Sequence, residues 1–559
     1  MKTALVASVI ALALSLHSGP ASAQTPAAPP TATPAAAAPP AATPITDEDI
    51  KNTPTPKPED KAAGDPAGTL TGTAADIPMA DSKKGLSVQD VVSLVGQNAI
   101  ATNFVWTLVA GFLVMFMQAG FAIVETGLGR AKNANHTMMM NFMVYGVGML
   151  AYWLIGFAIQ EGGVGAVANL GGTAPLNAEY AIQLFGKPWG LFGQKGVMLG
   201  GSTYDVGVMV MFLFQMVFMD TALTIVTGTA AERWRYSAFI ISSFIMGAFT
   251  YPLFANWAWG GGWLATLGSN FGLGHGYADF AGSGVVHSVG GVTALAMAII
   301  IGPRIGKFNR NGTPNAIPGH DITLVLLGCF ILAFGWFGLN PGSTLGAVAN
   351  GNLRISSVAV NTMLAGMAGS FTSMYYMWMR YGKPDASMTG NGFLAGLVAI
   401  TAPSGFVNPM ASVIIGLIAG VLCAVSCEVV ERKLKLDDVV GAISVHGTNG
   451  IWGVIAVGLF ADGKSNFGGA WNGVPGSVTG LFYGDAGQLV AQLIGVATLL
   501  GFVFTLSFVI NLVLDAVWGH RVAADVELAG LDIPEMGALG YPEFVLKAES
   551  VGAPIPAAR

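Results

Sequence analysis

The sequence predicts an all-α polytopic membrane protein with about eleven transmembrane helices, formed by two inverted five-helix repeats and a final helix. Three observations lead to this fold class. Of the 559 residues 53% are hydrophobic and only 10% are charged, too few charges to cover a soluble globule. From Phe104 onward, apolar segments of roughly 20 residues recur, which is the length that crosses a bilayer. Lysines and arginines gather in alternate connecting loops.

The chain divides into four parts. Residues 1–23 combine Lys2, the apolar run ALVASVIALALSL and the small-residue site ASA, which is typical of a secretory signal peptide. Residues 24–102 are Pro/Ala-rich and polar, so we expect an extended spacer on the periplasmic side. Residues 103–519 are expected to form the membrane domain, and residues 520–559 a cytoplasmic tail.

Hydropathy places the spans in order along the membrane domain. They are expected at 104–128, 138–159, 206–229, 237–254, 284–302, 322–339, 358–379, 389–401, 411–430, 442–460 and 489–517.

The basic residues predict the topology, because cytoplasmic loops carry the excess of lysine and arginine. They follow the first, third, fifth, seventh and ninth spans: Arg130, Lys132, Arg233, Arg235, Arg304, Lys307, Arg310, Arg380, Lys383, Arg432, Lys433 and Lys435. An odd number of spans then puts the N-terminus outside and the C-terminus inside, in agreement with the signal peptide.

A weak internal repeat relates the fifth and tenth spans. VVHSVGGV surrounds His287 and SVHGTNGI surrounds His446. Because the two segments are five spans apart, they would have opposite orientations, as in transporters whose substrate path lies between inverted repeats. Ionisable residues within a membrane are expensive and usually functional, although a lone histidine can also serve as a helix-packing hydrogen bond. A pair of neutral imidazoles can share a proton or offer polar atoms to a small molecule.

Other classes of function find little support in the composition. The net charge of −6 offers no basic surface for nucleic acid. We expect no enzyme activity, no cofactor and no metal site, because HExxH is absent, the cysteines fall within apolar runs and the other histidines are scattered. These residues are Cys329, Cys423, Cys427, His136, His275, His320 and His520.

The segment DFAGSGVVHSVGGVTALAMAIIIGPR, at 279–304, closely resembles the long signature of the ammonium transporters, the Amt/Mep/Rh family. The resemblance extends from Phe104 to about Pro542 and includes MQAGFAIVETGLGRAKN, AERWRYSAF, WAWGGGWL, FGWFGLNPGS and NGFLAGLVAITA. It implies a homotrimer whose protomers each contain a narrow pore lined by His287 and His446. It also implies a bacterial Amt-type protein that moves ammonium across the inner membrane.

The resemblance assigns further site residues motif by motif. Phe214 and Phe218 of FQMVF take the places of two pore aromatics, Trp259 that of the outer-site tryptophan, and Ser343 that of a hydroxyl acceptor. Leu339 stands where many members have a second gating phenylalanine. An ordinary aromatic helix interface is the alternative for the aromatics taken alone.

Acidic residues are assigned less specifically. Asp279 matches the acid before the first pore histidine, where it would attract the cation, assist deprotonation or cap the fifth helix. Gly441 stands where many members carry an aspartate five residues before the second histidine. Asp220 and Glu125 lie within predicted spans and receive no role, so paired or cavity-facing positions are expected for them.

We therefore expect recruitment of NH4+ at an outer aromatic site and conduction of NH3, with or without a separately relayed proton. The alternatives are an ammonium sensor or transceptor and a Rh-like channel for neutral gases, NH3 or CO2. The expected partners are ammonium or ammonia, the lipid bilayer, two further copies of the chain and a PII signalling protein at the tail.

Overall fold

The computed structural model describes residues 88–164, 166–170, 172–173, 176–348, 352–464 and 470–542. The expected signal peptide and most of the expected extension lie outside these residues. In chain order the spans are α3 (Val88–Leu128), α4, η5 and α5 (Ala134–Ala151, Tyr152–Gly156, Phe157–Glu161), α6 (Val206–Ala230), α7, η9 and α8 (Tyr236–Ile245, Met246–Thr250, Tyr251–Ala258), η10 and α10 (Ser283–Ser288, Val289–Ile301), α11 (Ile322–Leu339), α12 (Ile355–Tyr381), α13 (Ala386–Thr401), α14 and η13 (Pro409–Glu428, Val429–Lys433), η14 and α15 (Ile443–Thr448, Asn449–Phe460), and α16, η16 and α17 (Ala486–Thr498, Leu499–Val503, Phe504–Val517).

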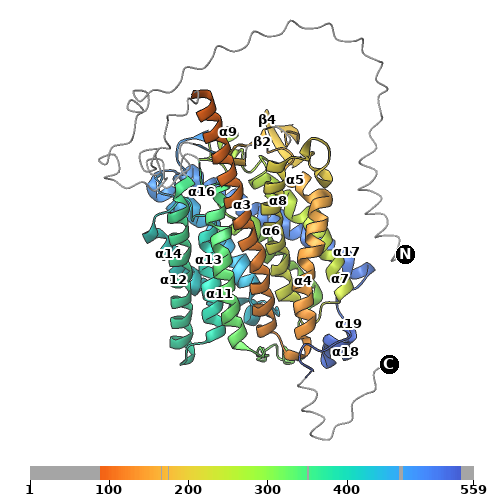
Figure 1. Ribbon diagram of the computed structural model, residues 1–559. Coiled ribbons are helices and arrows are strands. Elements are labelled where there is room, and N and C mark those ends of the chain that lie inside the picture. The colour runs from red at the N-terminus through yellow and green to blue at the C-terminus, as the bar shows by residue number, and fades with distance from the viewer. Residues whose placement is uncertain are drawn as a thin grey trace, which may run out of the picture. The chain divides into compact units, whose positions relative to one another are not determined.

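Long apolar helices account for the predicted spans. Among the described residues, nine helices are long and apolar enough to cross a membrane. Helix α12 and the shorter apolar helix α13 coincide with the other two predicted spans. The all-α membrane fold class is thus confirmed, and Figure 1 shows these helices running side by side from Thr102 onward.

Helix α3 begins at Val88, well before the predicted start at Phe104. Hydropathy marks only the apolar part of a helix, whereas backbone hydrogen bonding continues into polar sequence. The start of a membrane helix is therefore predicted less well than its apolar centre.

Small glycines and alanines allow α12, α13 and α14 to pack closely. A Cβ built on Gly392 would lie 2.2 Å from the Cβ of Ser373, and one on Gly416 would lie 2.2 Å from the carbonyl oxygen of Ala365. Close backbone approach of this kind stabilises helix association in a membrane, because apolar side chains gain no hydrophobic free energy by leaving lipid.

In the part of the chain that the structure describes, three two-stranded antiparallel sheets lie in the loops, where no strands were predicted. They pair β1 (Ala166–Val167) with β2 (Gly172–Thr173), β3 (Glu179–Leu184) with β4 (Lys187–Gly193), and β5 (Ala470–Trp471) with β6 (Val474–Pro475). The β3–β4 turn uses Phe185 and Gly186, with φ of 54° and 71°, as a two-residue hairpin with positive φ at both positions requires. Its Phe-Gly sequence lacks the usual Asn-Gly or Asp-Gly signal.

The segment after α17 packs against the helix ends of its own chain. It contains α18 (Ala524–Ala529) and α19 (Asp532–Met536). The Lys132 ammonium donates to the carbonyl oxygen of Glu527 at 2.7 Å, and the His136 backbone N–H donates to the Asp532 carboxylate at 3.0 Å. The tail is thus held by contacts that a binding partner would have to accommodate or break.

Candidate functional site

Two helices begin deep in the bundle with a π-helical turn, and each turn carries one of the expected histidines. His287 lies in η10 and His446 in η14. Gly282 precedes the first turn with φ of 112°, and Gly441 precedes the second with φ of 83°. Because only glycine adopts this backbone region without strain, Gly441 has a structural reason to stand where the resemblance led us to look for an aspartate.

An aspartate caps each of these two turns. Asp279 accepts hydrogen bonds from three backbone N–H groups at the start of η10, at 2.7–3.0 Å. Asp438 accepts two from the residues around the start of η14, at 2.8 and 3.1 Å, and one from the Thr229 hydroxyl at 2.8 Å. Each aspartate precedes its histidine by eight residues. This equal spacing of aspartate and histidine is present in the sequence but was not among the predictions made from it.

The two imidazoles meet at the crossing of these helices. The Nδ1 atoms of His287 and His446 are 3.2 Å apart, and their ring centroids are 5.3 Å apart at an interplanar angle of 27°. Both side chains are buried, and His287 also stacks on Trp336 at 5.2 Å. A hydrogen bond between two Nδ1 atoms requires one ring to donate and the other to accept, so this contact excludes two fully protonated imidazoles.

A cavity of about 370 Å³ lies beside one end of α6 and collects most of the other expected residues. The Ser343 hydroxyl donates to the carbonyl oxygen of Leu339 at 2.7 Å, so its lone pairs remain available to accept. Trp259 meets Phe218 edge-on with centroids 6.1 Å apart, and its indole N–H donates to the Asp279 carbonyl oxygen at 2.7 Å. The wall includes Glu161, Asn169, Met211, Phe214, Gln215, Phe218, Trp259, Phe280, Ser343 and Trp471.

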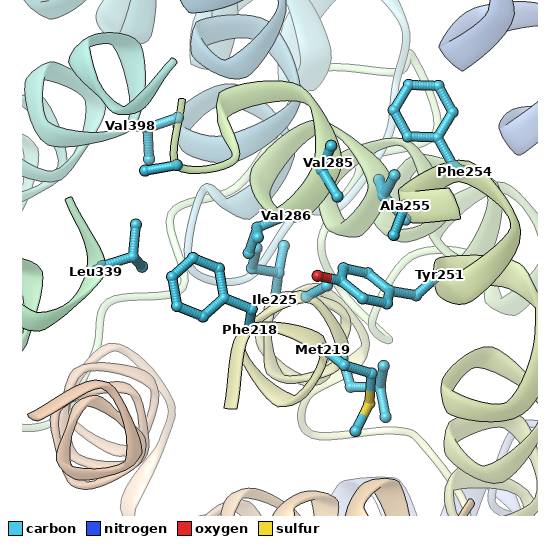
Figure 2. Close-up of a cluster of buried hydrophobic side chains, with 14 of the residues drawn as sticks. Phe218, Met219, Ile225, Tyr251, Phe254, Ala255, Val285, Val286, Leu339 and Val398 are labelled. Atoms are coloured by element: carbon cyan, nitrogen blue, oxygen red, sulfur yellow. The ribbon is translucent and has the colours of Figure 1, made fainter. Parts of the chain in front are cut away.

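Apolar side chains close the cavity toward the centre of the bundle. Phe214 and Phe218 have ring centroids 4.6 Å apart, and both are buried. Figure 2 shows Phe218, Leu339 and Val286 in one buried hydrophobic cluster. Leu339 therefore joins the apolar barrier without supplying a second phenyl ring.

Further cavities lie on the other side of the histidine pair. His446 lines a cavity of about 20 Å³ together with Phe121 and Glu125, which is enough space for about one water molecule. Asn391 and Val440 line both this small cavity and a larger one of about 740 Å³. The expected pore residues therefore lie on the wall of the outer cavity, on the wall of the small cavity beside His446, or in the apolar cluster that includes Phe218 and Leu339.

Glu125 and Asp220, the two acids without an assigned role, differ in their hydrogen bonding. Glu125 accepts hydrogen bonds from Asn141 at 2.7 Å and from Thr227 at 2.9 Å, as expected of a paired buried acid. Asp220 is buried, and its Oδ1 has no hydrogen-bond partner among the described residues. Glu161, which was not among the predicted site residues, ends α5 and lines the outer cavity. The polar pair Gln160–Glu161 at the end of an apolar span was the available signal.

Sequence comparisons with known proteins find ammonium transporters. A sequence profile described as the Ammonium Transporter Family matches residues 105–541. Ammonium transporter Amt2 of Archaeoglobus fulgidus is 45% identical over 449 residues, covering 80% of this chain and 89% of that protein. Ammonium transporter 1 member 3 of Solanum lycopersicum is 33% identical, covering 78% and 93%.

Solved structures share the fold. One described as Sensor Amt Protein is 33% identical with a TM-score of 0.67, covering 79% of this chain and 100% of that chain. The crystal structure of Candida albicans Mep2 is 28% identical with a TM-score of 0.64, covering 79% and 90%.

Proposed function

The chain belongs to the ammonium transporter family, and from this premise we propose that it moves ammonium across a membrane through the cavities around His287 and His446. The observation that carries the proposal is the 3.2 Å contact between the two Nδ1 atoms in a buried position. Buried imidazoles in direct contact, between cavities at both ends of the bundle, are suited to a small polar molecule that exchanges protons.

Recruitment takes place as NH4+ in the outer cavity. The faces of Phe218 and Trp259 attract a small cation by roughly 0.5–2 kcal/mol. The Ser343 hydroxyl, whose proton is already donated, accepts an N–H of the ion. These residues are the proposed substrate-binding set, together with Asp279 behind Trp259.

Passage through the barrier takes place as NH3. A bare cation among Phe214, Phe218 and Leu339 would lose its hydration without an equal replacement, at a cost of several kcal/mol. Loss of a proton before the barrier removes most of that cost. The proton then either stays outside or is relayed along the pair of histidines, and these alternatives differ in whether charge crosses the membrane.

The proposed setting is a bacterial inner membrane. The alternating basic loops support an outer N-terminus and a cytoplasmic C-terminus. A homotrimer and a PII signalling protein bound near α18 and α19 complete the proposal.

Ammonium sensing is the second candidate, because one structure with the same fold, at a TM-score of 0.67, is described as Sensor Amt Protein. A sensor would bind ammonium in the outer cavity and conduct little or none. A Rh-like passage of neutral NH3 or CO2 would use the same barrier without recruiting a cation.

Purified protein in liposomes on a solid support, given a pulse of ammonium, separates these candidates. A saturating current with ammonium, absent with potassium and lost in His446→Ala, is the expected result. An ammonium-dependent change of internal pH without current would indicate electroneutral NH3 conduction. Parent protein that gives neither signal would overturn transport in favour of sensing, and unchanged transport by His446→Ala at matched expression would remove that residue from the pore.

A further inference from the structure

The small cavity beside His446 has two titratable groups on its wall, and the proposed transport gives a role to only one of them. Among the described residues of that wall, these groups are His446 and Glu125. The other wall residues are apolar, such as Ile225 in Figure 2, or carry a neutral amide, as Asn391 does. With a volume of about 20 Å³, the cavity has room for about one molecule of the size of water or ammonia. A single molecule there lies next to both titratable groups.

His446 can offer a proton to this cavity through its second ring nitrogen. Its Nδ1 is 3.2 Å from the Nδ1 of His287, and its Nε2 has no hydrogen-bond partner among the described residues. When His287 donates in that contact, a neutral His446 accepts at Nδ1 and carries its own proton at Nε2. Once Nε2 has given that proton away, Nδ1 can take the proton of His287. The pair therefore relays a proton only if a group beyond Nε2 accepts one.

Neutral donors hold the Glu125 side chain in place. The Asn141 Nδ2 donates to Glu125 Oε2 at 2.7 Å, and Asn141 Oδ1 accepts from the Thr224 hydroxyl at 2.7 Å. In the part of the chain that the structure describes, no ion pair includes Glu125. This acid can therefore take up a proton without breaking an ion pair.

The carboxylate of Glu125, and not only its aliphatic stem, lies close to the cavity wall. A Cβ built on Gly228 would lie 3.1 Å from Glu125 Oε1 and 2.5 Å from Val440 Cγ2. Val440 lines the small cavity and also the larger one of about 740 Å³. The carboxylate is thus placed where a molecule leaves the histidine pair toward the larger cavity.

The Thr227 hydroxyl can follow the charge of Glu125. It lies 2.9 Å from each carboxylate oxygen and 2.5 Å from the carbonyl oxygen of Thr224. A hydroxyl has one proton, so it donates to only one of these acceptors at a time. It can donate to Glu125 when that acid is ionised and to Thr224 when the acid carries a proton. Both states of Glu125 thus keep their hydrogen bonds without movement of the backbone.

We propose that Glu125 accepts the relayed proton from His446 and delivers it to NH3 on the inner side of the histidine pair. This inference rests on the proposed passage of NH3, and it selects proton relay over a proton left outside. In the first step the N–H bond at His446 Nε2 breaks and an O–H bond forms on Glu125, directly or through the molecule in the cavity. In the second step that O–H bond breaks as its proton joins NH3, which gives NH4+ and restores the carboxylate.

The cycle closes through the other histidine. His446 regains a proton from His287, and His287 regains one that NH4+ loses on the outer side. Each turn therefore carries one nitrogen and one positive charge across the barrier.

The test is Glu125→Gln, which keeps the length of the side chain and removes the proton acceptor. In liposomes on a solid support, its ammonium current is expected to fall about a hundredfold or more, the usual loss when a proton-transferring group is removed. Conduction of NH3 does not need the relay, so an ammonium-dependent rise of internal pH is expected in place of the current. A purely structural role would reduce both signals together.

Two further variants accompany this one. Asp220→Asn is the matched control, because Asp220 is another buried acid within the spans but lines neither the small cavity nor the larger one. Its current is expected to equal the parent's. Thr227→Val keeps the shape of the side chain and removes the hydroxyl, so its current is expected to fall about tenfold, the effect of one hydrogen bond to a charged group.

Three results would overturn the proposal. They are parent-like current in Glu125→Gln, joint loss of current and pH change in that variant, and an equal loss of current in Asp220→Asn. If Glu125→Gln does not assemble, Thr227→Val decides, and parent-like current in that variant counts against the relay.

The two proposals fail separately. A parent that gives neither current nor pH change overturns transport. A parent that changes the internal pH without current transports NH3 and overturns the relay through Glu125.

Discussion

Replacing Gly291 with alanine is expected to break the contact between His287 and His446. Gly291 lies on α10, one turn after His287, where that helix crosses η14. A Cβ at this position would lie 2.2 Å from the backbone nitrogen of Gly447 and 2.4 Å from its Cα. These are backbone atoms, so no side chain can move away to make room.

The size of the effect follows from the geometry. Ordinary Cβ contacts begin at 3.4 Å, so the two helices must separate by about 1.2 Å. A similar increase at the Nδ1 atoms of His287 and His446 would take them from 3.2 Å to beyond hydrogen-bond distance. Overpacking of this kind costs about 1–3 kcal/mol of stability. A displacement of about 1 Å at a functional pair reduces activity about a hundredfold.

Gly447→Ala is the matched control on the facing helix. Its Cβ would lie 3.4 Å or more from the nearest atoms, all of them on Gly291, so the contact is ordinary. Alanine also favours the helix over glycine by up to about 1 kcal/mol, so this variant should have an unchanged or slightly higher Tm.

Ammonium-pulse current at matched protein density and Tm in detergent are the measurements for both variants. We expect Gly291→Ala to lose most of its current and to melt earlier, and Gly447→Ala to behave as the parent. Parent-like current in Gly291→Ala would show that the two helices are not in tight contact at Gly291. Equal losses of current and Tm in the two variants would show that Gly291 is not more closely packed than Gly447.

Three other predictions concern Trp259, Asp279 and Asp437. Trp259→Leu should weaken the apparent affinity for ammonium about twofold to thirtyfold through loss of the cation–π contact, measured as half-maximal current; an unchanged value would exclude Trp259 from recruitment. Asp279→Ala should lower stability by about 1–3 kcal/mol because three backbone N–H groups lose their acceptor, and Asp279→Asn should lose less; equal Tm for parent and alanine variant would contradict the capping role. Burial alone would raise the pKa of Asp437, but the hydrogen bond from Arg304 and the charges of Arg233 and Arg304 hold it well below its usual range. Since the depressed pKa stabilises the folded state above about pH 4 and this stabilisation disappears as the pH falls further, the Tm of the parent should drop on acidification more steeply than that of Asp437→Asn; parallel curves would refute the linkage.

Much of the architecture was predictable because hydropathy acts locally. An apolar run of bilayer length must bury its backbone polar groups in a helix, whichever neighbours it later contacts. Each predicted span accordingly coincides with a helix of the structure. The two segments that contain Val-His, in the fifth and tenth spans, were recognisable as a pair because each motif is a continuous stretch of sequence.

The distances between those segments were not predictable from composition. Whether His287 and His446 face each other depends on Gly291 and Gly447 meeting across two helices that are far apart in the chain. The distance between two crossing helices depends on the size of the side chains at the contact. A single sequence does not show which residues of the two helices meet there.

The hydrogen bonds that each acid makes could be assigned only from the tertiary structure. The sequence by itself determined the membrane class, the approximate spans, the histidine motifs and the presence of acids near them. Only the folded chain decided that the oxygens of Asp279 are occupied by backbone N–H groups while Glu161 keeps one oxygen unbonded among the described residues. The physical reason is that hydropathy depends on side-chain type, whereas the availability of a carboxylate depends on which donors, distant in sequence, reach it in the folded protein.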